Sequence, residues 1–267
     1  MNSHLILNIP HASTYLPPDA IPKPEWVLKS RSYVIQGMGG KFAIFNKVRE
    51  YFKKELLFMT DWYTDELFSN GIGRALVFPA SRLICDVERF RDPEQEPMEK
   101  IGMGICYSKK HNLEFLANPS EEHRQYILER YYDVYHRMLS YYVSETLNEH
   151  GRALILDCHS FSPVPLPYEP DQNPDRPDIC LGTDSFHTPE WLVNESVSFF
   201  ENKGYSVRIN SPYSGTMVPV FQYKWNERVE SIMIELNRGL YLKEGTNEKN
   251  DYFPVLKQHI AEFQRNV

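Results

Sequence analysis

The chain has little cysteine and no excess of positive charge, and these shortages exclude several classes of protein. Its four cysteines, Cys85, Cys106, Cys158 and Cys180, are far apart in 267 residues, which does not resemble a secreted disulfide framework. Lys and Arg number 29 against 36 Asp and Glu, for a net charge of −7. Nucleic-acid binders usually concentrate Lys and Arg on one face. We therefore expect a small-molecule partner and no nucleic acid.

The chain also lacks a long apolar run. No stretch reaches the roughly 20 residues that cross a bilayer, and residues 1–10 lack the basic start and apolar middle of a signal peptide. No membrane association is expected, and a cytoplasmic location with free thiols is predicted. At 267 residues, the chain is near the upper size of one hydrophobic core. A single catalytic domain over residues 1–267 is predicted, and the oligomeric state stays open.

What the chain does have is an alternation of short apolar runs with helix-forming stretches. Strands are predicted at residues 5–9, 75–79, 83–87, 153–156, 179–181, 206–209 and 231–235. Helices are predicted at 41–57, 120–149, 189–203 and 250–263, the second with Ser120 as N-cap and Gly151 just past its end. The proline-rich segment 17–24 and the charged stretch 89–100 are predicted loops. This order indicates an α/β fold whose mixed, mainly parallel sheet is covered on both faces.

Reactive side chains follow three of the predicted strands. His11 comes after the first strand, His159 after the middle one and Glu235 ends a late one. Ligands bind beyond the carboxyl ends of parallel strands, so these residues are expected to converge. Two histidines and one carboxylate can hold a catalytic zinc ion and leave a position for water, while a second carboxylate accepts the proton. Either histidine taken alone is more often a structural group than a ligand.

The third ligand has several candidates in the acidic segment 61–66. Asp65 and Glu66 have the spacing of a solvated helix face, whereas Asp61 precedes two aromatic residues and is the better candidate.

Three arginines could hold an anionic group. Arg82, Arg89 and Arg238 each present a planar fork that grips a carboxylate. Arg82 and Arg89 bracket Asp86, so an ion pair that only ties down the loop is an equal alternative.

These motifs together resemble the N-formylglutamate amidohydrolase family, which is related to zinc carboxypeptidases and aspartoacylases. The resemblance runs through most of the chain. It rests on Pro10-His11-Ala12-Ser13 and Cys158-His159-Ser160, and further on residues 61–67, 81–89, 102–105, 204–215 and 235–241.

The resemblance implies a three-layer αβα sandwich of the phosphorylase/hydrolase-like type and a hydrolase acting on a linear amide bond. Its substrate would be a carboxylate-bearing N-acyl amino acid. One zinc ion per chain would be held by His11 and His159, although other divalent transition metals could occupy such a site.

Roles for other residues also follow from the resemblance. Glu235 would be the general base, and Arg82 would assist catalysis. The substrate would be bound by Arg89, Arg238, Asn237 and Ser160. The carboxypeptidase relatives take their carboxylate ligand three residues beyond the first histidine, where this chain has Thr14. Asp61, which lies in a matched segment, is the remaining choice.

The chain departs from the family pattern at two places. Ala12-Ser13 stands where the family has Ser-Gly, and Glu88 stands where the family has a neutral Asn. A carboxylate at position 88 that faces the pocket would weaken the binding of a dicarboxylate substrate.

Two other functions are compatible with the sequence. One is a metal-independent hydrolase with Ser160, Ser13 or Cys158 as nucleophile, although no Gly-x-Ser-x-Gly elbow is present. The other is a catalytically silent binding or sensor protein that keeps the fold and the metal site.

Overall fold

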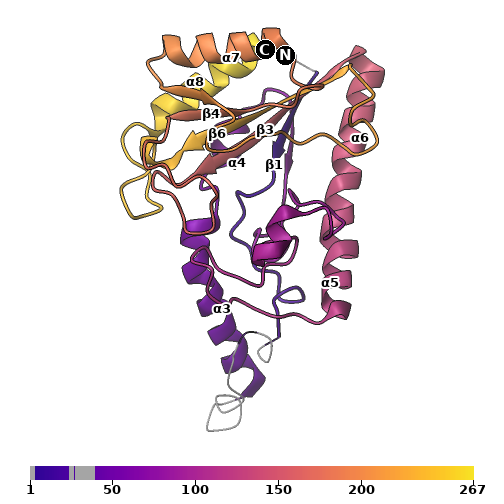
Figure 1. Cartoon of the computed structure of the whole chain (residues 1–267), viewed down its shortest axis with the longest axis vertical. Helices are drawn as coiled ribbons and strands as arrows, with labels where there is room; N and C mark the ends of the chain where they lie inside the picture. The colour runs from indigo at the N-terminus through magenta and orange to yellow at the C-terminus, as the bar shows by residue number, and fades with distance from the viewer. Residues whose placement is uncertain (1–3, 24–26, 28–39) are drawn as a thin grey trace.

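A six-stranded sheet with the strand order β2-β1-β3-β6-β4-β5 forms the centre of the molecule (Figure 1). The computed structural model describes residues 4–23, 27 and 40–267. The strands are β1 (Leu5–Ile9), β2 (Arg74–Val77), β3 (Ala153–Phe161), β4 (Ile179–Gly182), β5 (Val207–Ile209) and β6 (Val229–Asn237). Neighbouring strands are parallel except for β4 and β6. The predicted mixed, mainly parallel sheet is confirmed.

The helices fall close to the predicted ranges. They are α3 (Gly40–Met59), α4 (Thr64–Phe68), α5 (Glu121–Ile127), α6 (Asp133–His150), α7 (Glu190–Asn202) and α8 (Phe253–Asn266). A π-helical turn at Leu128–Tyr132 joins α5 to α6, and short 3-10 helices occur at Pro97–Ile101 and Arg238–Leu240. Ser120 accepts a hydrogen bond from the backbone N–H of His123, and Gly151 ends α6 at φ 74°. Both predicted caps of the long helix are therefore confirmed.

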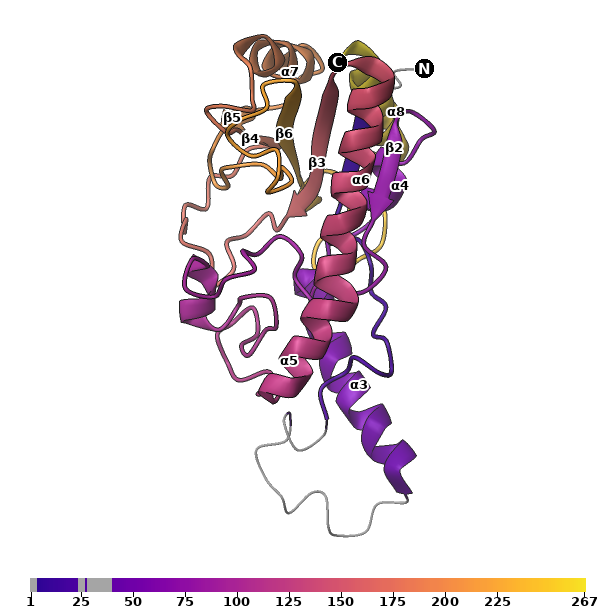
Figure 2. The same cartoon turned by 90° about the vertical axis from the view of Figure 1, so that its right-hand side faces the viewer.

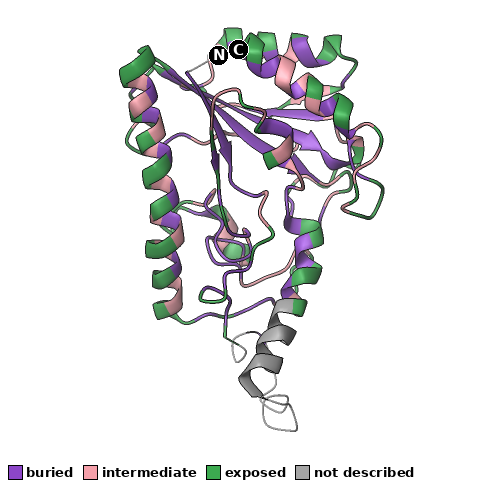
Figure 3. Cartoon of the chain, turned by 180° about the vertical axis from the view of Figure 1, so that it is seen from behind, coloured by how far each residue is buried: buried purple, intermediate pink, exposed green. Residues whose placement is uncertain are grey.

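Helices cover both faces of the sheet and make three layers (Figures 1 and 3). Because successive strand residues point to opposite faces, Ile155 of β3 packs in one apolar cluster while Leu154 and Leu156 pack in the other. The first cluster includes Leu139 of α6, and the second includes residues of α4, α7 and α8. The predicted αβα sandwich is confirmed.

The helices α3 and α5 extend beyond the carboxyl end of β3 (Figure 2). Loops and the 3-10 helix at residues 97–101 lie between them below the sheet (Figure 1). The carboxyl edge of the sheet is therefore covered by this extension, and side chains at that edge are enclosed.

The predicted strand at residues 83–87 is wrong. The segment forms turns, in which the N–H groups of Ile84 and Cys85 donate to the carbonyl of Ser81. Its apolar side chains are buried in the cluster on the α6 side of the sheet. A short apolar run indicates burial, and here the burial occurs in a folded loop instead of a strand.

The predicted loop at residues 17–24 has no helix or strand up to residue 23, and Pro24 lies outside the described residues. None of the helices in the described part of the chain is both long and apolar enough to cross a bilayer.

Leu139 and Met138 provide a test of the packing of α6. Leu139 is fully buried, whereas Met138 is 39% exposed. Leu139→Ala should lower the free energy of unfolding by about 2–5 kcal/mol because it leaves a cavity under the helix. Met138→Ala should change it by less than about 0.5 kcal/mol. Urea unfolding followed by circular dichroism measures both, and equal effects would contradict this packing.

Candidate active site

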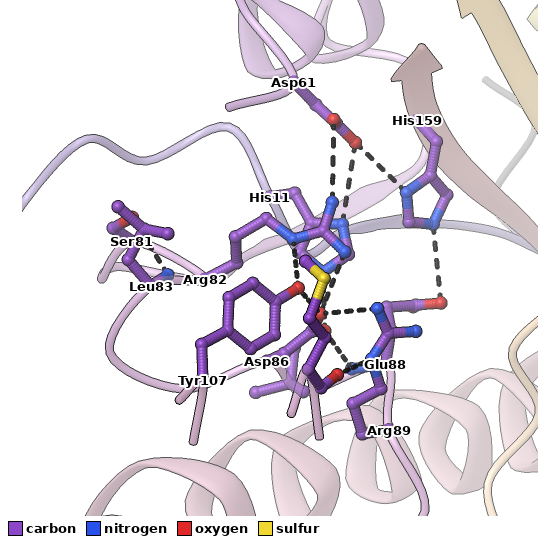
Figure 4. A network of polar contacts seen from close by, with 12 residues as sticks. His11, Asp61, Ser81, Arg82, Leu83, Asp86, Glu88, Arg89, Tyr107 and His159 are labelled. Carbon is purple, nitrogen blue, oxygen red and sulfur yellow. Dashed lines mark hydrogen bonds and ion pairs between the residues drawn. The ribbon is translucent and has the colours of Figure 1, made fainter. Parts of the chain in front are cut away.

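The three predicted metal ligands come together at the carboxyl edge of the sheet (Figure 4). His11 follows β1, His159 lies in β3 and Asp61 lies just after α3. Asp61 Oδ2 is 3.2 Å from Nδ1 of His159 and 3.6 Å from Nδ1 of His11. The backbone N–H of Asp61 also donates to the carbonyl of His11 at 3.1 Å. All three side chains are buried.

These three residues have the donor atoms and spacing of a metal site. Tetrahedral ligands at about 2.1 Å from a metal ion lie roughly 3.4 Å apart, which is close to the separations seen here. His11 Nδ1 is buried and has no hydrogen-bond partner among the described residues. An unpaired buried nitrogen is costly unless something binds it. Two imidazole nitrogens and one carboxylate oxygen suit zinc.

Each histidine forms a hydrogen bond with a carboxylate through the ring nitrogen that is farther from Asp61. Nε2 of His11 is 2.9 Å from Asp86 Oδ1, and Nε2 of His159 is 3.0 Å from Asp157 Oδ1. Since a carboxylate accepts the N–H at Nε2, Nδ1 of each ring keeps its lone pair for a metal ion. This carboxylate–imidazole pairing is common at zinc sites.

Asp86 is the centre of a buried ionic network (Figure 4). Its Oδ2 accepts hydrogen bonds from Tyr107 and from Arg82, the latter at 2.8 Å, and lies 3.3 Å from Nη2 of Arg89. Burial alone would raise the pKa of Asp86, but the two guanidinium groups hold it well below its usual range. Asp86 is therefore a permanent anion behind His11.

A second network supports His159. Asn8 donates to Asp157 at 2.8 Å and to Glu88 at 3.1 Å, and it accepts from the Tyr135 hydroxyl at 2.6 Å. Glu88 Oε2 lies 3.5 Å from Nε2 of His159. Glu88, Asp157 and His159 could themselves group around a cation. Because Asn8 donates to both carboxylates and His159 is hydrogen-bonded to Asp157, we assign Asp157 and Glu88 to supporting the imidazole.

The surroundings of His159 favour a positive charge at this place. Burial would lower the pKa of His159, but the carboxylates of Asp157 and Glu88 raise it well above its usual value. Burial would likewise raise the pKa of Asp61, yet the two neighbouring histidines lower it. A metal ion at Nδ1 of His159 would supply this positive charge in place of the proton.

Glu235 lies beside His159 because the two residues are paired in register across β3 and β6. Its side chain is buried, and Oε2 has no hydrogen-bond partner among the described residues. Burial raises the pKa of Glu235 to about 8, although the charge on His159 partly opposes this shift. An unpaired carboxyl group with a raised pKa next to a metal site is a candidate acid or base.

A cavity of about 450 Å³ opens onto these groups. Its lining includes the predicted substrate residues Arg89, Arg238 and Ser160, together with Arg82 and Glu235. The Ser160 hydroxyl is itself buried. The structure thus brings all but one of the predicted site residues to a single cavity.

Asn237 is the exception, because it does not line this cavity. Its amide donates to the carbonyl of Pro177 at 3.0 Å, and its side-chain oxygen accepts from the N–H of Gly239. Asn237 shapes the turn after β6 and in this way positions Arg238.

Two of the three alternative nucleophiles, Cys158 and Ser13, lie away from this cavity. Cys158 packs in the apolar cluster on the opposite face of β3 from His159, and burial raises its pKa well above the usual range. The Ser13 hydroxyl donates to the carbonyl of Pro79. Ser160 is the only one of the three that lines the cavity.

The sequence interpretation missed the carboxylates behind the histidines. The position of Asp157 could have been predicted from the sequence. Residues two apart on a strand point to the same face, which places Asp157 beside His159. Asp86 was considered only as a partner of Arg82 and Arg89. Nothing in the local sequence connects it to His11, which is 75 residues away.

Comparisons with known proteins point to one family. The model of the N-formylglutamate amidohydrolase family matches residues 44–242, a segment that contains Asp61, His159 and Glu235. A search of curated proteins finds no match.

Two solved structures resemble the chain. One is the N-formylglutamate amidohydrolase from Ralstonia eutropha JMP134, with a TM-score of 0.75 and 23% identity over 99% of this chain and 92% of that one. The other is a gene product from Agrobacterium tumefaciens, with a TM-score of 0.59 and 17% identity over 99% of this chain and 91% of that one. At these identities, the likeness shows a shared fold.

Asp86 and Asp133 allow a test of the ionic network. Asp86→Asn should lower the free energy of unfolding by about 3–5 kcal/mol, because it leaves two buried guanidinium groups without their anion. Asp133→Asn breaks a surface pair with Arg91 and should cost less than about 1 kcal/mol. Urea unfolding at pH 7 compares the variants, and similar losses for both would refute the role of Asp86.

Proposed function

The chain belongs to the N-formylglutamate amidohydrolase family, and from this premise we propose that it hydrolyses the N-acyl bond of an amino acid with the help of one zinc ion. Membership makes the chain a hydrolase of amide bonds that acts on a small molecule. The zinc ion, the roles of individual residues and the substrate are the proposal. The observation that supports it best is that three potential metal ligands lie near the unpaired carboxyl group of Glu235.

His11, Asp61 and His159 would hold the zinc ion through Nδ1, Oδ2 and Nδ1. A zinc ion at this position supplies a Lewis acid that lowers the pKa of a water molecule and polarises an amide carbonyl. Asp86 and Asp157 keep the two imidazole rings in the orientation that such binding requires.

Glu235 would move the proton during hydrolysis. Its raised pKa describes the site without a cation, and a nearby positive charge favours the carboxylate form. Oε2 of Glu235 then accepts a proton from the attacking water and returns it to the departing amine nitrogen. Water adds to the acyl carbon, the C–N bond breaks, and the products are a carboxylic acid and a free amino acid.

Two arginines would hold charge on the substrate. Arg82 lies next to the metal donors, with Nη1 4.0 Å from Asp61 Oδ1, so it can stabilise the negative charge that develops on the carbonyl oxygen. Arg238 donates through Nη1 to the carbonyls of Phe58 and Thr60 at 3.0 and 2.6 Å. No hydrogen bond of its Nε or Nη2 to the described residues is present, and these atoms can bind a substrate carboxylate.

Metal content provides the first test. Protein purified without chelator should contain about one zinc ion per chain by elemental analysis, and the double variant His11→Ala, His159→Ala should contain almost none, because a single carboxylate cannot hold zinc. His259→Ala, which changes a histidine outside the site, should keep the metal. Full zinc occupancy in Asp61→Asn would refute Asp61 as a ligand. A different metal in the native protein would show that zinc is not the native ion.

Glu235→Gln tests the general base. The variant should keep its zinc but lose a factor of about 10²–10⁴ in kcat for an N-formyl amino acid, because the amide cannot accept the proton. Glu230→Gln on the same strand should keep normal kcat, since Glu230 lies outside the cavity and bonds to Trp191. Normal kcat in zinc-loaded Glu235→Gln would refute this role, and hydrolysis that survives chelation would refute the metal mechanism.

A further inference from the structure

A second hollow of about 570 Å³ borders the active-site cavity. Phe58, Ser162 and Arg238 line both spaces. These three residues therefore form a wall that the two spaces share. The remaining apolar lining consists of Leu57, Trp62, Pro163, Val164, Leu166 and Leu242.

We propose that this hollow receives an apolar side chain of the substrate, so that the enzyme prefers N-acyl amino acids with one carboxylate and an apolar side chain. The proposal rests on the proposed function and names its substrate class. It assigns Val164 and Leu166 to substrate selection, in addition to the residues that carry the chemistry.

Arg238 gives the substrate its orientation. Arg238 is almost buried, its Nη1 is fixed by two backbone carbonyls, and the residue lines both spaces. A substrate whose α-carboxylate binds there has its α-carbon at the border. Its acyl group can then reach towards the metal donors while its side chain extends over the apolar hollow.

The border between the two spaces is held in place from both sides. The Phe58 ring stacks on the His111 imidazole, with centroids 3.8 Å apart and an angle of 16° between planes. His111 is fixed in turn by the buried carboxylate of Glu55, at 2.9 Å. On the other side, the carbonyl of Ser162 accepts a hydrogen bond from Arg176. A rigid wall of this kind can select one side-chain shape over another.

A second carboxylate on the substrate would find little to bind. In the active-site cavity, Arg82 and Arg89 are both paired with Asp86, Glu169 is paired with Arg176, and Glu88 adds a carboxylate to the lining. Glu88 lines the cavity at the position where the family has a neutral Asn. The carboxylate of Glu88 disfavours a dicarboxylate such as an N-acylglutamate.

The apolar hollow offers no better partner for a carboxylate. Apart from Arg238, its charged lining residues are Lys243 and Glu244. Lys243 is 60% exposed at the side chain and is already paired with Glu248 at 2.9 Å. An exposed pair of this kind contributes little to binding.

The test compares three substrates on the zinc-loaded full chain: N-formyl-L-leucine, N-formyl-L-glutamate and N-formylglycine. The leucine derivative should have a kcat/KM about tenfold to 100-fold above that of the glutamate derivative, as expected from burial of an apolar side chain in place of a carboxylate. A kcat/KM that is equal or higher for the glutamate derivative would overturn the proposal. Hydrolysis of none of the three would instead overturn the proposed function, and this inference with it.

A matched pair of variants tests whether the hollow causes the preference for an apolar side chain on the substrate. Val164→Asp places a carboxylate in the hollow and should lower the leucine-to-glycine ratio of kcat/KM about tenfold. Val220→Asp changes another exposed loop valine, outside both spaces, and should keep the native ratio. Both valines are largely exposed, so both variants should fold. A native ratio in Val164→Asp would show that the hollow does not receive the side chain.

Discussion

Two buried hydrogen bonds between a carboxylate and an imidazole control the candidate site. Asp86 holds Nε2 of His11, and Asp157 holds Nε2 of His159. Each bond selects the tautomer whose Nδ1 is unprotonated and directs that atom towards Asp61. If either ring turned over, the donor set would be lost, and Glu235 would have no metal site beside it. The cavity and its arginines are useful only while both rings keep this orientation.

Charges enclosed in this way must be paired, since an isolated buried ion is very unfavourable. Asp86 is paired with Arg82 and Arg89, and Asp157 accepts from Asn8 and from the backbone N–H of Met217. The two networks belong to different parts of the molecule. Asp86 lies in a loop below the sheet, whereas Asp157 lies in β3, so the site forms only where the loops meet the strands.

Local patterns predicted much of the framework. The six strands and the long capped helix follow from apolar runs, alternation and capping residues, which act over a few neighbouring positions. Residues 83–87 were predicted wrongly because a short buried run reads the same in a strand and in a packed loop. His159 and Glu235 were predicted near the carboxyl edge, and they lie there as register partners on β3 and β6.

The sequence by itself determined the fold class, the burial of the strands and the residue types available for metal binding, because these depend on composition and short-range periodicity. Only the tertiary structure decided which carboxylate meets the two histidines and which carboxylates stand behind them. Asp61 and Asp86 reach His11 from 50 and 75 positions away. Such pairings depend on how loops fold over the edge of the sheet, and no local pattern records the path of a loop.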